Sequence, residues 1–358
     1  MRAESLSFFK SLVEAPSPSG YEQPAASVMR AYLEPLSDDV VTNVMGSVHA
    51  LLRGSDAERD GRRVSVMLAG HIDEIGMMVT YITPEGFIAF KPIGGVDEAV
   101  LPAMRVRVHT KEGPLLGILG RMPIHLLEED ERKAVTKVHK LFIDLGMSAE
   151  RVKEIVRVGD PITFDVGFEE FGEGMVVSRA FDDKMGAFIC AEVLRLVRER
   201  GGAKVDLVVA GTVQEEIGLR GGVTSAYGVD PTVGVAVEVG HATDFPDVDK
   251  RKHGEAACGK GPIIARGANI NPTVFRLLCE AAESAEVPHQ FDGEPRATGT
   301  DANAIQLARG GKAAALVSVP LRYMHTPVEA LALADVEAAI ELLAAFVLGL
   351  DPDTDYTP

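Results

Sequence analysis

From about residue 174 onward, short apolar runs alternate with longer segments of helical periodicity. Runs such as VDLVVAGTV and VGVAVEV are too hydrophobic for strands with one face in water, so they indicate strands that are covered on both sides. Alternating strands and helices predict an α/β domain with a mostly parallel mixed sheet flanked by helices. The expected strands cover 64–69, 205–213, 233–239 and 313–319, and the expected helices cover 4–15, 22–35, 183–200, 272–285 and 333–349.

A different pattern occupies residues 75–170. Short β-branched runs such as MMVTYI and RVRVHT alternate there with Gly and Pro, which predicts a small all-β unit, either a barrel or a sandwich. A charged stretch inside it, 128–140, is expected to be an exposed loop or a short helix. We therefore expect an α/β domain built from residues 1–73 and 172–358, interrupted by a β insert at 74–171.

The charge balance narrows the possible partners. Lys and Arg number 36 against 53 Asp and Glu, so the net charge is −17. A chain this acidic repels phosphate backbones, which argues against nucleic acid and anionic membranes as partners. The 3 cysteines lack metal or redox spacing, and no apolar stretch reaches the roughly 18 residues of a membrane span. These features predict a cytoplasmic protein.

His or acidic residues lie at the predicted strand ends, where open α/β sheets bind their ligands. His71 follows the first buried run, and Asp73 comes two positions later, where an extended chain brings it to the same face. Asp73 can accept the second imidazole N–H and orient the ring, or it can serve as a turn residue. Asp182 and Asp183 precede a predicted helix, so either they cap that helix or one of them bridges two cations.

Glu215 and Glu216 end an apolar strand, where neighbouring side chains face opposite ways. One of them can ligate a metal while the other acts as general base, although a solvated loop is the alternative. Glu238 interrupts a buried run, and an unpaired buried carboxylate costs several kcal/mol, so it needs a salt bridge or a cation. His325 lies in a proline-bounded loop. Thr300 and Asp301 are either substrate-side groups or the start of a helix.

Six segments of the chain, taken together and in order, resemble the tetrahedral aminopeptidase family of cocatalytic two-metal metallopeptidases. This family includes deblocking, glutamyl and leucyl aminopeptidases, and some members carry an endoglucanase label. The resemblance spans residues 70–327 and rests on GHIDEIGMMV, SRAFDDKMGAF, VQEEIGLRGG, VEVGHATDFP, TGTDANAIQLARGG and VPLRYMHTP.

The resemblance implies a phosphorylase/hydrolase-like catalytic domain and a small PDZ-like β insert that serves dimerisation, with dimers assembling into a tetrahedral dodecamer. It also implies two divalent ions, for which Zn²⁺ or Co²⁺ suits His and carboxylate ligands without sulfur. His71 and Glu238 would hold one ion, Glu216 and His325 the other, and Asp182 would bridge them. Glu215 would be the general base, Asp73 would orient His71, and the Asp182–Asp183 peptide would be cis. Family members often have Asp where this chain has Glu238, which is a departure from the pattern.

The expected function is therefore a metal-dependent aminopeptidase acting on peptides with a free N-terminus. A metal-dependent amidohydrolase that removes N-acyl groups uses a similar site and remains open. A glycoside hydrolase also needs paired carboxylates, but it needs no histidines, and Trp is absent from the chain. A metal-binding protein without catalysis would need the ligands but not a free base.

Overall fold

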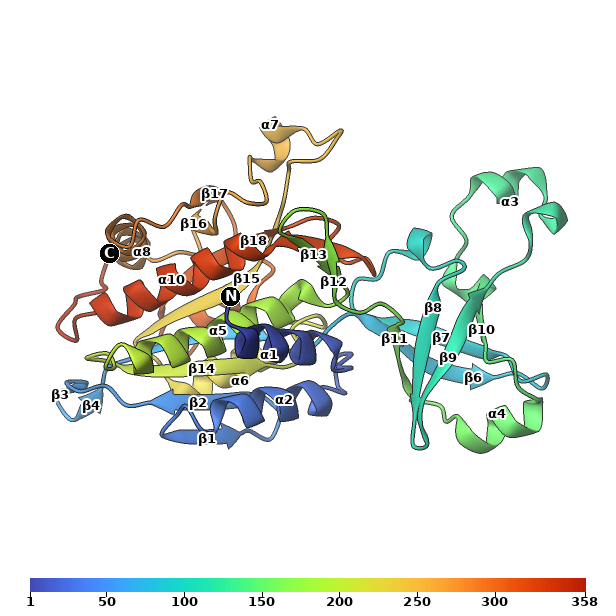
Figure 1. The fold of residues 1–358 in the computed structure, drawn as a ribbon, viewed down its shortest axis with the longest axis horizontal. Helices are drawn as coiled ribbons and strands as arrows, with labels where there is room; N and C mark the ends of the chain where they lie inside the picture. Colours follow the sequence, from blue (N-terminus) through green and yellow to red (C-terminus); the bar gives the residue numbers. More distant parts are fainter.

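An eight-stranded mixed sheet forms the centre of the structure, a computed structural model that describes residues 1–358 (Figure 1). The neighbours β14, β5, β15 and β18 are parallel, so their carboxyl ends lie at one edge of the sheet. Across the sheet the strands are β1 (Asp39–Thr42), β2 (Val48–Leu52), β14 (Asp206–Thr212), β5 (Ser65–His71), β15 (Val233–His241), β18 (Ala313–Leu321), β16 (Ile263–Gly267) and β17 (Gln290–Glu294).

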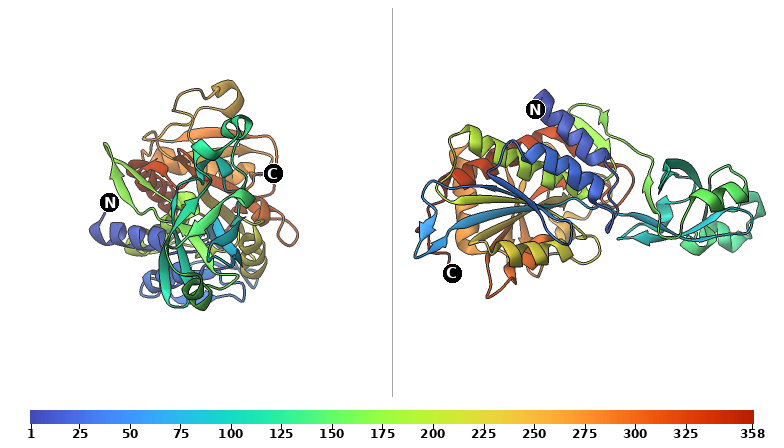
Figure 2. Two further views of the ribbon diagram at one scale, coloured as in Figure 1. Left: turned by 90° about the vertical axis from the view of Figure 1, so that its right-hand side faces the viewer. Right: turned by 90° about the horizontal axis from the view of Figure 1, so that it is seen from below.

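Helices cover both faces of this sheet, as the view from below shows (Figure 2). The central helix α5 packs against β5, β14 and β15, and it is buried along almost its whole length. Helices α6 and α9 cover the opposite face, where they contact each other and the central strands. On the α5 side lie α1 (Ala3–Glu14), α2 (Gln23–Leu33), α5 (Phe181–Glu199), α8 (Pro272–Ser284) and α10 (Leu333–Gly349), and on the other side lie α6 (Arg220–Val229) and α9 (Asp301–Gln306).

The predicted fold class is confirmed, and the five predicted helices correspond to α1, α2, α5, α8 and α10. The sequence analysis did not anticipate α6, because its glycines disfavour helix. Two of these glycines are required by packing. A Cβ at Gly221 would lie 2.3 Å from the carbonyl oxygen of Val213, and one at Gly222 would lie 2.2 Å from Oδ1 of Asp301. The close approach of α6 to the sheet thus outweighs local propensity.

A closed six-stranded barrel projects from one end of the sheet body (Figures 1 and 2). It has a hydrophobic cluster of its own, separate from the large cluster around the main sheet. The charged segment 128–140 is exposed and contains α3 (Glu129–Lys133) and a 3₁₀ turn (Val138–Lys140). The barrel contains β6 (Gly76–Ile82), β7 (Ile88–Ile93), β8 (Arg105–Thr110), β9 (Gly113–Gly120), β10 (Phe142–Asp144) and β11 (Pro161–Phe164), with α4 (Ala149–Ile155) packed beside it.

A small three-stranded sheet follows the barrel. It consists of β12 (Glu169–Phe171), β13 (Met175–Ser178) and β19 (Glu329–Ala332), with β13 in the middle. β12 lies inside the insert predicted at 74–171, but it does not pair with a barrel strand. It pairs with β13, which belongs to the predicted α/β domain. The domain limits at 73/74 and 171/172 stay a prediction.

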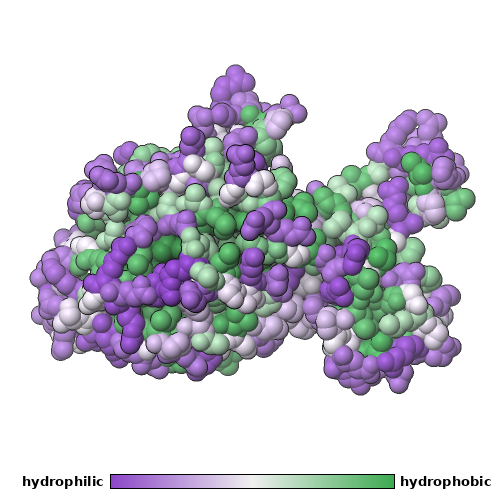
Figure 3. Space-filling model, viewed as in Figure 1, coloured by the Kyte–Doolittle hydropathy of each residue, from purple (hydrophilic) through white to green (hydrophobic).

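The barrel carries several exposed apolar side chains, seen as green areas on the right of the space-filling view (Figure 3). Such residues on a surface mark contact sites when they gather in one region. They include Leu116, Ile118, Met122, Ile124, Leu126 and Val135. None of the helices combines the length and the apolar character that a membrane crossing requires.

Candidate metal centre

A cavity of about 1070 Å³ opens at the carboxyl edge of the central strands. The strand order places the ends of β5, β14, β15 and β18 side by side, and each strand or the loop that follows it contributes a side chain. Residues far apart in sequence thus meet here, as the sheet topology requires. All five predicted ligands and the predicted base line the cavity, namely His71, Asp182, Glu215, Glu216, Glu238 and His325.

Asp182 lies between the two predicted histidines. Its Oδ1 is 3.1 Å from Nε2 of His71, and its Oδ2 is 3.3 Å from Nε2 of His325. His71 is buried at the end of β5, whereas His325 lies in the loop after β18 and is about one third exposed. One carboxylate therefore faces two imidazoles through separate oxygens, which is the arrangement that a bridging ligand needs.

Glu215 and Glu216 do not lie in a strand, because β14 ends at Thr212. The premise that they alternate across a sheet was therefore wrong. The backbone turns at Gln214, which has a φ of +57°, and both acids face the same cavity. They are nevertheless inequivalent: Oε2 of Glu215 lies 3.8 Å from Nε2 of His71, and Oε2 of Glu216 lies 3.4 Å from Nε2 of His325.

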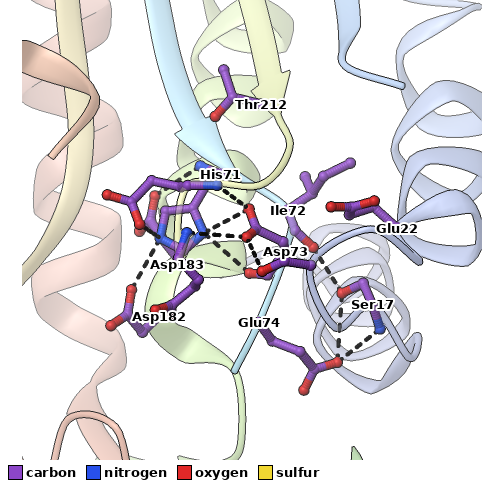
Figure 4. Close-up of polar contacts among 12 residues, drawn as sticks. Ser17, Glu22, His71, Ile72, Asp73, Glu74, Asp182, Asp183 and Thr212 are labelled. Atoms are coloured by element: carbon purple, nitrogen blue, oxygen red, sulfur yellow. Dashed lines mark hydrogen bonds and ion pairs between the residues drawn. The ribbon is translucent and has the colours of Figure 1, made fainter. Parts of the chain in front are cut away.

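Asp73 lies beside His71 (Figure 4) and also contacts the backbone of the two glutamates. Its Oδ1 accepts the backbone N–H of Glu215 at 3.0 Å, and its Oδ2 accepts that of Glu216 at 3.2 Å and the hydroxyl of Ser19 at 2.7 Å. Nδ1 of His71 is 3.4 Å from Oδ1 of Asp73 but 3.1 Å from its carbonyl oxygen. Asp73 thus positions the Glu215–Glu216 loop as well as the imidazole.

Asp183, for which the sequence left a helix cap or a metal bridge open, is completely buried beside the centre. Its Oδ1 accepts the N–H of Gly186 at 3.1 Å, which is a capping interaction with α5. Its Oδ2 accepts the backbone N–H of His71 at 3.1 Å (Figure 4). The Asp182–Asp183 peptide is cis, as the resemblance implied. Asp183 thus acts as the cap of the helix, whereas Asp182 faces the cavity, where a ligand that bridges two cations would lie.

Glu238 lies in β15 with 3% of its surface exposed. Its Oε1 accepts the backbone N–H of Asp301 at 3.2 Å, and its Oε2 lies 3.8 Å from Nε2 of His71. Thr300 lines the cavity, but Asp301 lies behind the wall and accepts the hydroxyl of Thr212 at 2.6 Å. Asp301 therefore supports Glu238 from a buried position instead of facing the cavity itself.

A buried ion-pair cluster, which the sequence analysis missed, lies on the far side of Asp73. Glu74 pairs with Arg179, and its Oε1 is 3.0 Å from Nζ of Lys184. The same oxygen accepts the backbone N–H of Ser17 at 2.9 Å (Figure 4). Lys184 also donates to the carbonyl of Ala15. This cluster joins the loop after α1, the loop after β5 and the start of α5, and so it fixes the frame that carries His71 and Asp182.

Crowded acids and low solvent access shift the pKa values in the cavity. Burial raises the pKa of Glu215 to about 7 and that of Glu216 to about 8, and the charge of Asp182 adds to the latter shift. The hydrogen bond to Asp182 raises the pKa of His325 to about 9. Burial alone would raise the pKa of Asp182, but hydrogen bonds from His325 and His71 hold it well below its usual range.

The side chains present fit divalent metal ions. Two groups have ligand atoms that all lie within 4.8 Å of one another: His71 with Asp182 and Glu216, and His71 with Asp183 and Glu238. In addition, Oε1 of Glu216 is buried without a hydrogen-bond partner. Such an unsatisfied carboxylate oxygen, beside two imidazoles and further acids, is what a cation would satisfy.

This fold and this acid–histidine centre define an α/β protein equipped for metal-dependent hydrolysis. A match to the M42 glutamyl aminopeptidases covers residues 46–342. The chain therefore belongs to the M42 glutamyl aminopeptidase family.

Similar proteins cover the chain almost from end to end. A lysyl aminopeptidase of Pyrococcus furiosus is 34% identical over 353 residues, which is 98% of each chain. The crystal structure of a TET aminopeptidase from a marine sediment Thaumarchaeota archaeon has a TM-score of 0.91 at 35% identity and covers 97% of each chain. The TET1 peptidase of Pyrococcus horikoshii, described as assembling into a tetrahedron or a large octahedral shell, has a TM-score of 0.84 at 29% identity over 97% of this chain and 100% of its own.

Proposed function

We propose that the chain is a two-metal aminopeptidase that hydrolyses the N-terminal residue from peptides. The observation that carries this proposal is the meeting of Asp182 with both His71 and His325 in a cavity that also holds Glu215 and Glu216. These five imidazole and carboxylate groups lie together at the carboxyl edge of the sheet. Such an arrangement suits two adjacent cations that share one carboxylate. Membership of the M42 family supports the aminopeptidase activity.

The contacts support a specific division of the ligands. We assign His71 and Glu238 to one ion, Glu216 and His325 to the other, and Asp182 to both. His71 and Glu238 approach each other at 3.8 Å, and Glu216 and His325 at 3.4 Å, so each pair is already gathered around its own position. Zinc or cobalt suits this set of imidazole and carboxylate donors.

When bound, a pair of such ions lowers the pKa of a shared water and polarises the scissile carbonyl. Glu215 is the proposed general base: it takes the proton from the attacking water and returns it to the leaving amine. Glu215 lines the cavity, and its Oε2 lies 3.8 Å from Nε2 of His71, so this carboxylate is close to the proposed ions without being one of the assigned ligands. Asp73 holds the backbone N–H of Glu215 and so keeps this carboxylate in place.

The remainder of the cavity supports a preference for cationic N-terminal residues. No Lys or Arg is among its lining residues, while Asp292 and Glu294 lie at one end without an ion-pair partner. Between them and the metal centre the lining is apolar and includes Ile263, Ala265 and Leu316. A side chain with a long apolar stem and a positively charged end would fit this cavity, because the stem would lie along the apolar lining and the charge would face the two acids. The lysyl specificity in the name of the Pyrococcus furiosus relative agrees with this proposal.

We also propose that the chain assembles into a homo-oligomer. The barrel, with its exposed apolar residues on and after β9, would join two subunits, and such dimers would form a tetrahedral dodecamer. The TET1 peptidase of Pyrococcus horikoshii, which is described as assembling into a tetrahedron or a large octahedral shell, supports a homo-oligomer. Light scattering on the purified chain tests this, since a monomer in solution would contradict it.

The function itself is tested with aminoacyl chromogenic substrates, with and without a chelator. We expect cleavage that the chelator abolishes and that Zn²⁺ or Co²⁺ restores. The same peptide with an acetylated N-terminus should resist hydrolysis; preferential cleavage of the acetylated form would instead favour an N-acyl amidohydrolase. Release of reducing sugar from a glycan would favour the glycoside hydrolase alternative.

A further inference from the structure

Glu329 is a buried carboxylate without a cationic partner. It begins β19, and 2% of its surface is exposed. Glu74, which is equally buried, is paired with both Arg179 and Lys184. A carboxylate that is removed from water without such a partner is costly, so its interactions require an explanation.

Both oxygens of Glu329 accept backbone hydrogen bonds, and both donors belong to proposed metal ligands. Oε2 accepts the N–H of Asp182, and Oε1 accepts that of His325, each at 3.1 Å. Burial and then the charge of Asp182 raise the pKa of Glu329 well above its usual range. Both oxygens keep lone pairs for these bonds in either protonation state. A single side chain thus joins two segments that are distant in sequence.

The conformation of His325 makes this contact important. Its φ is +60°, a region that residues with a Cβ seldom adopt. It lies near the tip of a hairpin that Arg322 and Ala330 close by exchanging two backbone hydrogen bonds. The imidazole of His325 contacts Asp182 and Glu216 through Nε2, and its Nδ1 is 3.0 Å from the carbonyl oxygen of Gly95, whereas its backbone N–H is held by Glu329. Removing the Glu329 contact would leave the backbone of this strained residue without an anchor.

Strand pairing brings Glu329 to the second segment. β19 is antiparallel to β13, with Glu329 opposite Ser178. Only three residues separate Ser178 from Asp182, and one of them, Ala180, has a φ of +60°. Glu329 therefore reaches across the end of this short sheet to the turn that presents Asp182.

We infer that Glu329 is a positioning residue that sets the affinity of the ion held by His325 and Glu216. This inference rests on the proposed two-metal site. The other ion depends on different anchors, because Asp183 accepts the N–H of His71 and Asp301 donates to Glu238. Asp182 is shared by both ions, but the ion held by His325 and Glu216 would lose the support of His325 as well as that of Asp182. Loss of the Glu329 contacts should therefore weaken this ion more than the other.

The test is a calorimetric zinc titration of the metal-stripped protein and of Glu329→Gln. The glutamine has the same size, but its amide nitrogen cannot accept an N–H, so one of the two contacts is lost. We expect the Kd of one zinc site to rise by about 10- to 100-fold, as is usual for groups that orient metal ligands, while that of the other rises less. Should Glu329→Gln fail to fold, Glu329→Asp replaces it, since its shorter side chain cannot reach both amides; the same selective loss is expected.

Asp335 provides a matched control. It is also buried, and it accepts two backbone N–H groups, from Gly259 at 2.6 Å and from Gly261 at 2.7 Å, but neither belongs to a proposed ligand. Asp335→Asn should lower stability and leave both zinc affinities unchanged. Equal loss at both sites, unchanged binding in the Glu329 variants, or the same selective loss in Asp335→Asn would overturn the inference. A wild-type chain that binds no zinc would instead refute the proposed two-metal function.

Discussion

Oδ2 of Asp182 lies 3.3 Å from Nε2 of His325, although the two residues come from opposite ends of the catalytic half of the chain. The other oxygen of the same carboxylate faces His71. Asp182 is thus the only carboxylate of the centre with one oxygen within 3.5 Å of each imidazole. Its removal should affect both metal positions at once.

Asp182→Ala should therefore lose both ions together. Mass spectrometry under native conditions, or elemental analysis of the purified protein, would measure the metal content per chain. His241→Ala is a suitable control, because His241 lines the same cavity from an exposed position. That variant should keep the wild-type metal content. If Asp182→Ala retains two ions, the bridging ligand is a different residue.

Glu215→Gln should keep its metals and lose most of its turnover. The amide cannot accept the proton from water, and general base catalysis contributes about 10²- to 10⁴-fold to a rate. Because Asp73 holds the backbone of Glu215 and not its side chain, the loop should remain in place. Measuring kcat beside metal content separates the two effects. Wild-type kcat in this variant would remove Glu215 from the role of base.

The unpaired acids at the far end of the cavity should determine side-chain preference. Asp292→Asn and Glu294→Gln are expected to lower kcat/KM for lysyl substrates relative to leucyl substrates by about two- to fivefold each, since a partly exposed ion pair contributes up to about 1 kcal/mol. Glu255→Gln is the control, because Glu255 is already paired with Lys250. A wild-type enzyme that prefers glutamyl over lysyl substrates would contradict the preference while leaving the aminopeptidase activity intact.

Two glycines of α6 should respond in opposite ways to the same substitution. A Cβ at Gly222 would lie 2.2 Å from Oδ1 of Asp301, which is completely buried and has no room to move. We expect Gly222→Ala to destabilise the fold by about 1–3 kcal/mol. A Cβ at Gly228 meets nothing within 4 Å, so Gly228→Ala should stabilise the helix by up to about 1 kcal/mol. Urea unfolding of both variants tests the pair, and a stabilising Gly222→Ala would show that α9 can shift.

His109 in the barrel should make stability depend on pH. Burial, followed by the charge of Arg179, lowers the pKa of His109 from 6.5 to about 4, and its Nε2 is 2.8 Å from Oγ1 of Thr163. Between these pH values the unfolded chain binds the extra proton and the folded chain does not, so stability falls as the pH falls below 6.5. We expect His109 to account for about 1–2 kcal/mol of the stability lost between pH 6.5 and pH 5. Unfolding of His109→Gln at both pH values should show a correspondingly smaller loss; an identical pH dependence would contradict this.

The sequence predicted the sheet and its main helices because buried strands and amphipathic helices leave strong periodic signals. Glu238 was conspicuous because a carboxylate in an apolar run is costly, and His71 because it ends a predicted buried strand. The adjacent carboxylates Asp182 and Asp183 indicated that one of them could bridge two cations, but only the resemblance selected Asp182. His325 carries no local signal, and only the resemblance placed it in the centre. The three-stranded sheet had no signal either, because its middle strand β13 pairs with β19, a strand about 150 residues further along the chain.

The groups that support the centre could not be predicted in this way. Asp183 and Glu329 act by accepting backbone N–H groups of other residues, and a backbone donor leaves no trace in the sequence. Asp73 was predicted to orient His71, but its hydrogen bonds to the backbone of Glu215 and Glu216 were not. The cluster of Glu74, Arg179 and Lys184 likewise depends on three separate loops that meet only in the folded chain. Such contacts follow from the tertiary arrangement and become visible only with it.

The loop after β7 ties the projecting barrel to the chemistry of the other body. Gly95 accepts a hydrogen bond from Nδ1 of His325, and a Cβ at that position would lie 2.8 Å from this nitrogen. The insert therefore contributes directly to the cavity, because Gly95 lines it, and excision of the insert would remove the contact of Gly95 with His325. A neighbouring subunit that bound the barrel would therefore influence the position of the His325 imidazole through Gly95, without contacting His325 itself.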